Sequence, residues 1–151
     1  MIHIWTDGAC DQTGTKAGGW ATIIDEDGDL VHLSGNEPQT TNNRMELKAI
    51  IAALEVAVPA ITEDVVVHTD SELIVKQRTG EYTIKNNKDL NSWLDAIVRS
   101  LKQIQGVDVI WQWHPRNSHA HLQWCDKQAK YEREQLDAGP MRRLKSKYNP
   151  Q

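Results

Sequence analysis

Four carboxylate residues occupy positions from which they could act together. Asp7 follows the alternating segment IHIWT, and Asp70 follows the apolar segment VVVHT. Glu46 falls inside the apolar arc of the helix predicted from TTNNRMELKAIIAALE, at about 100° per residue. Asp126 lies in about the first turn of the last predicted helix, on the side expected to be buried. Carboxylates packed together repel one another unless they bind divalent cations, and hard oxygen ligands suit Mg²⁺ or Mn²⁺.

Each of these acids also has a purely structural interpretation. If Asn43 is the N-cap of its helix, Glu46 is at position N3 and completes a capping box. Asp70 could cap the helix that follows it, and Asp126 could be stabilised near the N-terminus of its helix by the positive end of the helix dipole. For a single acid the two interpretations compete. For two strand-end acids and a helix acid on a buried face, the shared metal site is the stronger explanation.

The elements that must position these acids follow from the hydrophobic pattern. The pattern predicts three strands, a helix, a fourth strand, two further helices, a fifth strand and a last helix. This order indicates an α/β fold, a five-stranded mixed sheet with three antiparallel strands first and parallel strands later, flanked by helices. In such sheets ligands gather beyond the carboxyl ends of the strands. The expected strands are 2–6, 18–25, 30–35, 65–69 and 107–113, and the expected helices are about 43–59, 71–78, 90–101 and 122–137.

Composition indicates one globular domain that works inside the cell. The chain has 151 residues with 39% hydrophobic residues, and its net charge of −4 does not by itself favour a nucleic-acid partner. The start MIHIWTDGAC lacks the pattern of a secretory signal, so none is expected, and no apolar run reaches membrane length. The only two cysteines, Cys10 and Cys125, favour a reducing cytoplasm, with a disulfide as the alternative. Nothing indicates an obligate protein partner, a membrane or more than a monomer. The segment MRRLKSKY in the C-terminal tail, 139–151, is either solvated or a phosphate contact.

The four acidic segments together resemble one family. TDGAC, TTNNRMELKAIIAALE, HTDSELIV and CDKQA are similar, in order and spacing, to those of type 1 ribonuclease H, and the resemblance covers about residues 2–138, taken as a single domain 1–138. The resemblance implies a ribonuclease H-like fold and an endoribonuclease that hydrolyses the RNA strand of RNA–DNA hybrids with two Mg²⁺ ions, Mn²⁺ being able to substitute. It implies 5′-phosphate and 3′-hydroxyl ends. It also implies that Asp7, Glu46, Asp70 and Asp126 are the metal ligands.

The same resemblance suggests where the hybrid is bound. It places Asn42 and Asn43 near the cut, Gly8 beside the first acid and Thr41 at a DNA phosphate. The remaining contacts depart from the pattern of many relatives. Where these have Gln after Asp-Ser the chain has Glu72, which puts that contact in doubt. A substrate Asn is missing after TDGAC, and whether Gln12 or Thr13 replaces it is left open. TGE fills the place of a Lys- and Trp-rich helix, so binding of the hybrid is expected to be weaker unless Lys85, Asn86, Lys88 or the tail compensates.

The loop before the last acid leaves three candidates open. Relatives usually carry a histidine ten residues before the final Asp, which is thought to help proton transfer or product release, and Arg116 has that place here. His119 is favoured because SHAH resembles the family's His-Ala-Gly-His, with Arg116 and His121 as alternatives and His114 nearby. An imidazole with a pKa near 6.5 could transfer a proton at neutral pH. At least two of the three histidines are expected to be ordinary loop residues facing solvent.

Two further expectations concern the side chains that fill the hydrophobic core and the rival functions. Because the chain has six Trp and no Phe, the tryptophans are predicted to fill the core, Trp93 and Trp124 covering Trp111 and Trp113 of the fifth strand. Stacking on nucleic-acid bases is the alternative. The rival functions are an integrase-like or junction-cleaving enzyme on the same scaffold, and a hybrid-binding module without catalysis.

Overall fold

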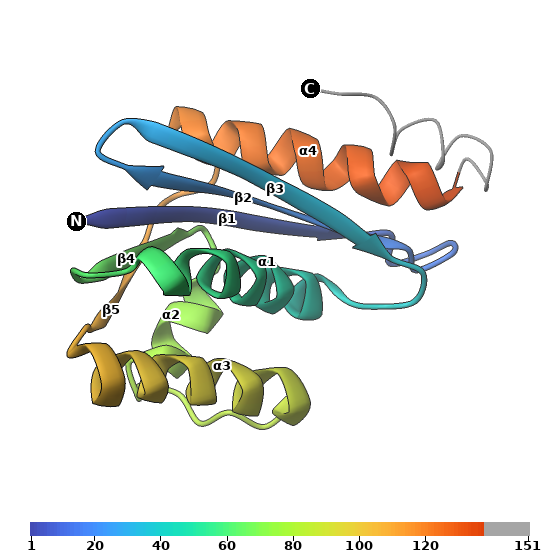
Figure 1. The fold of residues 1–151 in the computed structure, drawn as a ribbon. Helices are drawn as coiled ribbons and strands as arrows, with labels where there is room; N and C mark the ends of the chain where they lie inside the picture. Colours follow the sequence, from blue (N-terminus) through green and yellow to red (C-terminus); the bar gives the residue numbers. More distant parts are fainter. Residues whose placement is uncertain (138–151) are drawn as a thin grey trace.

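A computed structural model describes residues 1–137, so the expected basic tail lies outside the described residues. Its centre is one five-stranded sheet in the order β3-β2-β1-β4-β5 (Figure 1). The first three strands are antiparallel, and β4 and β5 run parallel to β1, as the sequence predicts. The strands are β1 (Ile2–Cys10), β2 (Gly18–Glu26), β3 (Asp29–Glu37), β4 (Val65–Thr69) and β5 (Val109–Trp113).

Helices cover both faces of the sheet. In Figure 1, α4 lies across one face of β1, β2 and β3, and α1 lies on the opposite face with α3 beyond it. Between α2 and α3 the chain runs through residues 79–87 without a further helix. The helices are α1 (Asn42–Ala57), α2 (Glu72–Arg78), α3 (Lys88–Ser100) and α4 (Ala120–Asp137), with a short 3₁₀ turn η1 (Val58–Ala60) and a π turn η2 (Leu101–Gln105). No helix in the described part of the chain is long and apolar enough to cross a membrane.

The hairpin of β1 and β2 is longer than the sequence indicated. The prediction that Asp7 ends the first strand is wrong, because the small residues GAC continue the antiparallel pairing as far as Cys10 opposite Gly18. The parallel pairing of β1 with β4 stops earlier, at Trp5 opposite His68. Asp7 therefore lies just beyond the point where β1 loses its parallel neighbour, at the edge where a ligand can approach.

The N-cap of helix α1 lies two residues before the expected cap. Thr41, not Asn43, is the N-cap, and its hydroxyl accepts a hydrogen bond from the Arg44 N–H. Glu46 is then the fifth residue of the helix and is too far along to complete a capping box. At the start of α2 the cap is Ser71, whose hydroxyl accepts from the Ile74 N–H, so Asp70 is not required for capping.

The later elements differ at their ends. The π turn η2 closes on Gly106 in a left-handed conformation, and β5 starts at Val109, two residues later than expected. Helix α4 starts at Ala120, two residues earlier than expected, so Asp126 is its seventh residue and lies beyond the first turn. A helix-dipole role for Asp126 is correspondingly weak, since the effect falls off within the first turn.

Aliphatic side chains make up the core, and the prediction that tryptophans fill it is wrong for two of them. Trp93 and Trp113 are 43% and 40% exposed, whereas Trp5 is buried. Trp124 lies under α4 against His32 of β3, on the side of the sheet away from α3, and does not cover β5. The core between the sheet and α1 is built mainly from Ile, Leu and Val, including Ile4, Ile50, Leu54, Val67 and Leu94.

Candidate metal centre

Three of the four predicted acids converge at the edge of the sheet. Asp7 comes from β1, Asp70 from the residue after β4, and Glu46 from the first half of α1. One carboxylate oxygen from each lies within 4.8 Å of the other two, the spacing at which a single metal ion can bind all three. Asp7 and Glu46 are buried, at 5% and 7% exposed. The placement of a carboxylate on the buried face of α1 is thereby explained, because this side chain points at Asp7.

Gly8 allows α1 to come this close to β1. A Cβ atom at Gly8 would lie 2.6 Å from the backbone nitrogen of Glu46 and 2.7 Å from the carbonyl carbon of Met45. Only a residue without a side chain fits between the strand and the helix backbone at this point. The Gly8 N–H also donates to Asp7 Oδ1 at 2.8 Å, which fixes the orientation of the carboxylate.

Burial, with the charge of neighbouring acids, raises the pKa values of all three acids. Burial, and then the charge of Asp70, raises the pKa of Asp7 to about 7. Burial, followed by the charge of Asp7, raises the pKa of Glu46 well above its usual range. Burial also raises the pKa of Asp70, against the opposing effect of the Arg116 guanidinium. In the absence of a cation, the fold therefore disfavours full ionisation of this group.

A buried oxygen without a partner shows what the group lacks. Glu46 Oε2 is buried and has no hydrogen-bond partner among the described residues. Such an atom costs free energy unless a ligand satisfies it. A divalent cation with oxygen ligands would satisfy it and would lower the pKa values of all three acids, so the residues present fit a metal ion.

Asp126 lies in the same cavity but in a different environment. The cavity has a volume of about 380 Å³ and is lined by all four acids together with Asn42, Asn43, Gly8, Ala9, Cys10, Ser71, Arg116, Lys130 and Arg133. Lys130 Nζ lies 3.1 Å from Asp126 Oδ2, and Arg116 Nη2 lies 3.8 Å from Asp126 Oδ1. Asp126 is not one of the three acids whose ligand atoms lie within 4.8 Å of one another.

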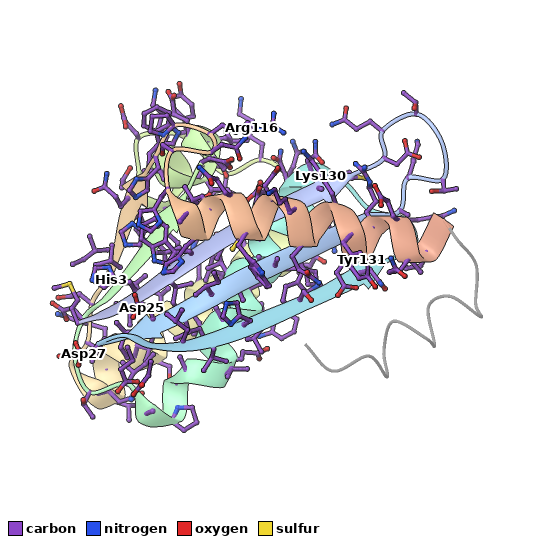
Figure 2. All side chains as sticks on the ribbon, turned by 90° about the horizontal axis from the view of Figure 1, so that it is seen from above. His3, Asp25, Asp27, Arg116, Lys130 and Tyr131 are labelled. Atoms are coloured by element: carbon purple, nitrogen blue, oxygen red, sulfur yellow. The ribbon has the colours of Figure 1, made fainter. Side chains whose placement is uncertain are left out.

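Two cations of this cavity were not found from the sequence. Lys130 and Arg133 follow Asp126 on α4 by four and seven residues, a spacing that puts all three on one side of a helix. Once Asp126 is a candidate ligand, this spacing is the signal that identifies them. Figure 2 shows Lys130 on the side of α4 that faces Arg116, and Tyr131 on the other side.

The loop candidates are separated by the structure. Arg116 lines the cavity, whereas the His119 ring stacks on Trp5 with centroids 3.9 Å apart, and its Nδ1 accepts from the His121 N–H. His121 meets the Trp5 ring edge-on and lies 3.8 Å from Asp25. Burial and then the charge of His119 lower the pKa of His121. Of the three, Arg116 is therefore the one placed beside the acids.

His114 belongs to a line of imidazoles instead. His68 lies between His3 and His114, with nitrogen–nitrogen distances of 2.8 and 2.7 Å, and its ring stacks on the face of Trp5 at 3.8 Å. Burial and then the charge of His114 lower the pKa of His68 to about 3, so this imidazole is neutral at neutral pH. The Trp5 ring is held between two histidine rings next to the metal centre.

The residues expected to contact substrate are partly at the cavity. Asn42, Asn43 and Gly8 line it. The hydroxyl of Thr41 is engaged in capping α1, and Glu72 is exposed and paired with Lys76 at 2.8 Å. Asn86 is exposed on the segment between α2 and α3.

Comparison with known proteins gives a consistent result. The ribonuclease H family model matches residues 1–134. Ribonuclease H of Thiobacillus denitrificans is 35% identical over 141 residues, covering 81% of this chain and 89% of that protein, and ribonuclease HI of Caulobacter vibrioides is 35% identical over 139 residues, covering 79% and 87%. The crystal structure of LC11-RNase H1 in complex with an RNA/DNA hybrid matches with a TM-score of 0.75 at 25% identity, covering 90% of this chain and 99% of that one. The chain belongs to the ribonuclease H family.

Proposed function

We propose that the protein is a metal-dependent endoribonuclease that hydrolyses the RNA strand of RNA–DNA hybrids, leaving 5′-phosphate and 3′-hydroxyl ends. The observation that carries the proposal is the convergence of Asp7, Glu46 and Asp70, with the buried Glu46 Oε2 lacking a partner among the described residues. The relatives named ribonuclease H and the related structure solved with an RNA/DNA hybrid support the choice of substrate.

The four acids are the proposed metal ligands. Asp7, Glu46 and Asp70 would hold one Mg²⁺ ion, and Asp126 would contribute to the site of a second, with Mn²⁺ able to substitute. Two such ions activate a water and stabilise the leaving oxygen of a phosphodiester. Gly8 orients Asp7 by its N–H, and the rigid packing of α1 on β1 fixes Glu46.

Positioning of the hybrid and transfer of the proton fall to residues around the acids. Asn42 and Asn43, at the start of α1 and in the cavity, are proposed to bind the RNA near the cut. Gly8 would contact it through the backbone, and Thr41, Glu72 and Asn86 remain proposed contacts at the periphery. For the role of the family's loop histidine, location favours Arg116, with His119 and His121 as the alternatives.

We also propose a monomer of one domain, residues 1–138, that acts in the cytoplasm. Cys10 and Cys125 are both free and buried, which supports a reducing compartment over the disulfide alternative.

The test is cleavage of a labelled RNA–DNA hybrid with Mg²⁺, Mn²⁺ or chelator, beside duplex DNA, duplex RNA and single-stranded RNA. Metal-dependent cutting confined to the RNA of the hybrid is expected. Asp70→Asn should reduce cleavage at least about 10³-fold because it removes a ligand from the triad, with the circular dichroism spectrum and melting temperature preserved.

Two results would contradict the proposal. Cleavage by Asp70→Asn at the wild-type rate, with contaminating nuclease excluded, would remove the metal-centre argument. Cutting of duplex DNA without RNA would favour an integrase-like or junction-cleaving enzyme, and hybrid binding without cleavage would favour a binding module.

A further inference from the structure

Asp126 differs from the other three acids because it is already bound to cations of the protein. Lys130 Nζ lies 3.1 Å from Asp126 Oδ2, and Arg116 Nη2 approaches Asp126 Oδ1 at 3.8 Å. The carboxylates of Asp7, Glu46 and Asp70 lie close to one another, and Glu46 Oε2 lacks a hydrogen-bond partner among the described residues. Arg116 is near enough to Asp70 to oppose the rise of its pKa, but among the described residues only Asp126 of the four acids forms an ion pair with a cation.

The charges that line the cavity make the same division. Four carboxylates face three basic side chains, Arg116, Lys130 and Arg133. Lys130 Nζ is closer to the Asp126 carboxylate than Arg116 is, at 3.1 Å against 3.8 Å, and the Asp126 side chain is only 14% exposed. The carboxylate is mostly buried while the ammonium is partly exposed, so solvent screens the pair only in part and a second cation at Asp126 must compete with the ammonium for the same oxygens.

Helix α4 keeps Asp126 in place while Lys130 can move. The helix packs against the β1–β2 hairpin so closely that a Cβ atom at Gly19 would collide with the Ala129 carbonyl. The Lys130 side chain is 43% exposed and ends a flexible four-carbon stem. Displacing the ammonium therefore needs a rotation of one side chain and no movement of the helix.

We propose that the Lys130 ammonium pairs with the Asp126 carboxylate in the free protein and must move away before a divalent ion can bind to this carboxylate. Lys130 thus acts on the metal site through Asp126, as a positioning residue. The inference rests on the proposed function, because it assigns an order to the two metal sites of that function. The ion held by Asp7, Glu46 and Asp70 binds first and more tightly, and Lys130 weakens the binding of the second.

The experiment measures Mn²⁺ binding without nucleic acid, by electron paramagnetic resonance or titration calorimetry, in the chain of 151 residues. Lys130→Gln removes the competing charge and should tighten the weaker Mn²⁺ site roughly tenfold while changing the tighter site little. Lys127→Gln is the matched control, since Lys127 is exposed on the same helix, is not among the cavity-lining residues and carries the same charge. Lys130→Arg keeps the charge and should keep the weak site weak.

A second readout is the Mg²⁺ concentration for half-maximal cleavage of a hybrid, which should fall in Lys130→Gln and not in the control. Equal affinity of the weaker site in wild type and Lys130→Gln would overturn the inference. Weaker Mn²⁺ binding in Lys130→Gln would also overturn it, because Lys130 would then orient Asp126 for the ion. Wild-type protein that neither binds Mn²⁺ nor cleaves the hybrid would instead refute the proposed function, which separates the two failures.

Discussion

Gly8 sits where a strand and a helix approach each other so closely that no side chain fits. The contact brings Glu46 of α1 to Asp7 of β1, and the same glycine donates its N–H to the Asp7 carboxylate. The metal centre depends as much on this absent side chain as on the carboxylates. A search for acidic residues alone would not reveal that dependence.

Gly8→Ala should therefore weaken both stability and metal binding. The new methyl group would overlap backbone atoms of Met45 and Glu46, which cannot rotate away, so α1 must shift from β1. The free energy of unfolding should fall by roughly 1–3 kcal/mol, the usual cost of overpacking. Denaturant unfolding measures this loss, and Mn²⁺ titration should show weaker binding at the tighter site.

A matched control separates the two effects. Ile61→Val removes a methyl group from the core at a position outside the cavity and should cost about 1 kcal/mol. Its Mn²⁺ affinity should equal that of wild type. If Gly8→Ala binds Mn²⁺ as tightly as this control, the close approach of α1 is not what positions Glu46.

At the scale of elements, the sequence contains the type and order of the strands and main helices but not all of their ends. Alternation in IHIWT and the apolar run VVVHT identify β1 and β4. The extension of β1 to Cys10 could not be read from GAC, because small residues have weak strand preference and the pairing with β2 decides the matter. The N-cap of α1 was placed wrongly because TTNN offers four residues that can all cap a helix, and only the tertiary packing selects Thr41.

The candidate site was predictable to a similar extent. The convergence of the three acids follows from the end of the β4 segment, from helix periodicity and from Asp7 lying just past the apolar segment IHIWT, although β1 itself continues beyond Asp7. The roles of the loop before α4 do not, because position along a loop does not determine which side chain turns toward the cavity. In this structure Trp5 holds the His119 ring by stacking and Arg116 is left beside the acids.

In the loop before α4, Arg116 should thus contribute to catalysis and His119 to stability. Arg116→Ala should lower kcat for hybrid cleavage about tenfold or more, because the guanidinium lies near Asp126 and depresses the pKa of Asp70. His119→Ala should mainly lower the melting temperature, because a ring stacked on buried Trp5 is lost. Steady-state kinetics and thermal unfolding of both variants check this, and a flattened pH–rate profile in His119→Ala alone would reverse the assignment.

At the scale of the whole molecule, the acids couple folding stability to pH. The pKa of Asp7 is about 7 in the fold and near 3.8 in the unfolded chain, and the pKa values of Glu46 and Asp70 are also raised. Groups whose pKa is raised in the fold stabilise it when protonated, so without metal their contribution is lost as pH rises from about 4 through 7. A divalent cation binds the ionised acids and restores that contribution above this range.

The melting temperature should accordingly rise with Mg²⁺ by a few degrees at pH 8 and hardly at all at pH 5, for a Mg²⁺ concentration about ten times the dissociation constant. The difference with and without metal is the quantity to measure. His68, whose lowered pKa destabilises the fold as pH falls below about 6.5, acts equally on both samples. An equal Mg²⁺ effect at the two pH values, or no effect in wild type at pH 8, would contradict this coupling.

The parallel register of β1 and β4 also determines when the metal centre can form during folding. Ile2 pairs with Val65, so these neighbours in the sheet are far apart along the chain, whereas β1 and β2 form a hairpin. Closing the longer loop costs more chain entropy, and non-local pairing is slow to form. Asp7 can be in place on the hairpin before Asp70 arrives with β4. Recruitment of an ion by the complete triad is thus a late event on the folding pathway, and metal capture marks the arrival of β4 in the sheet.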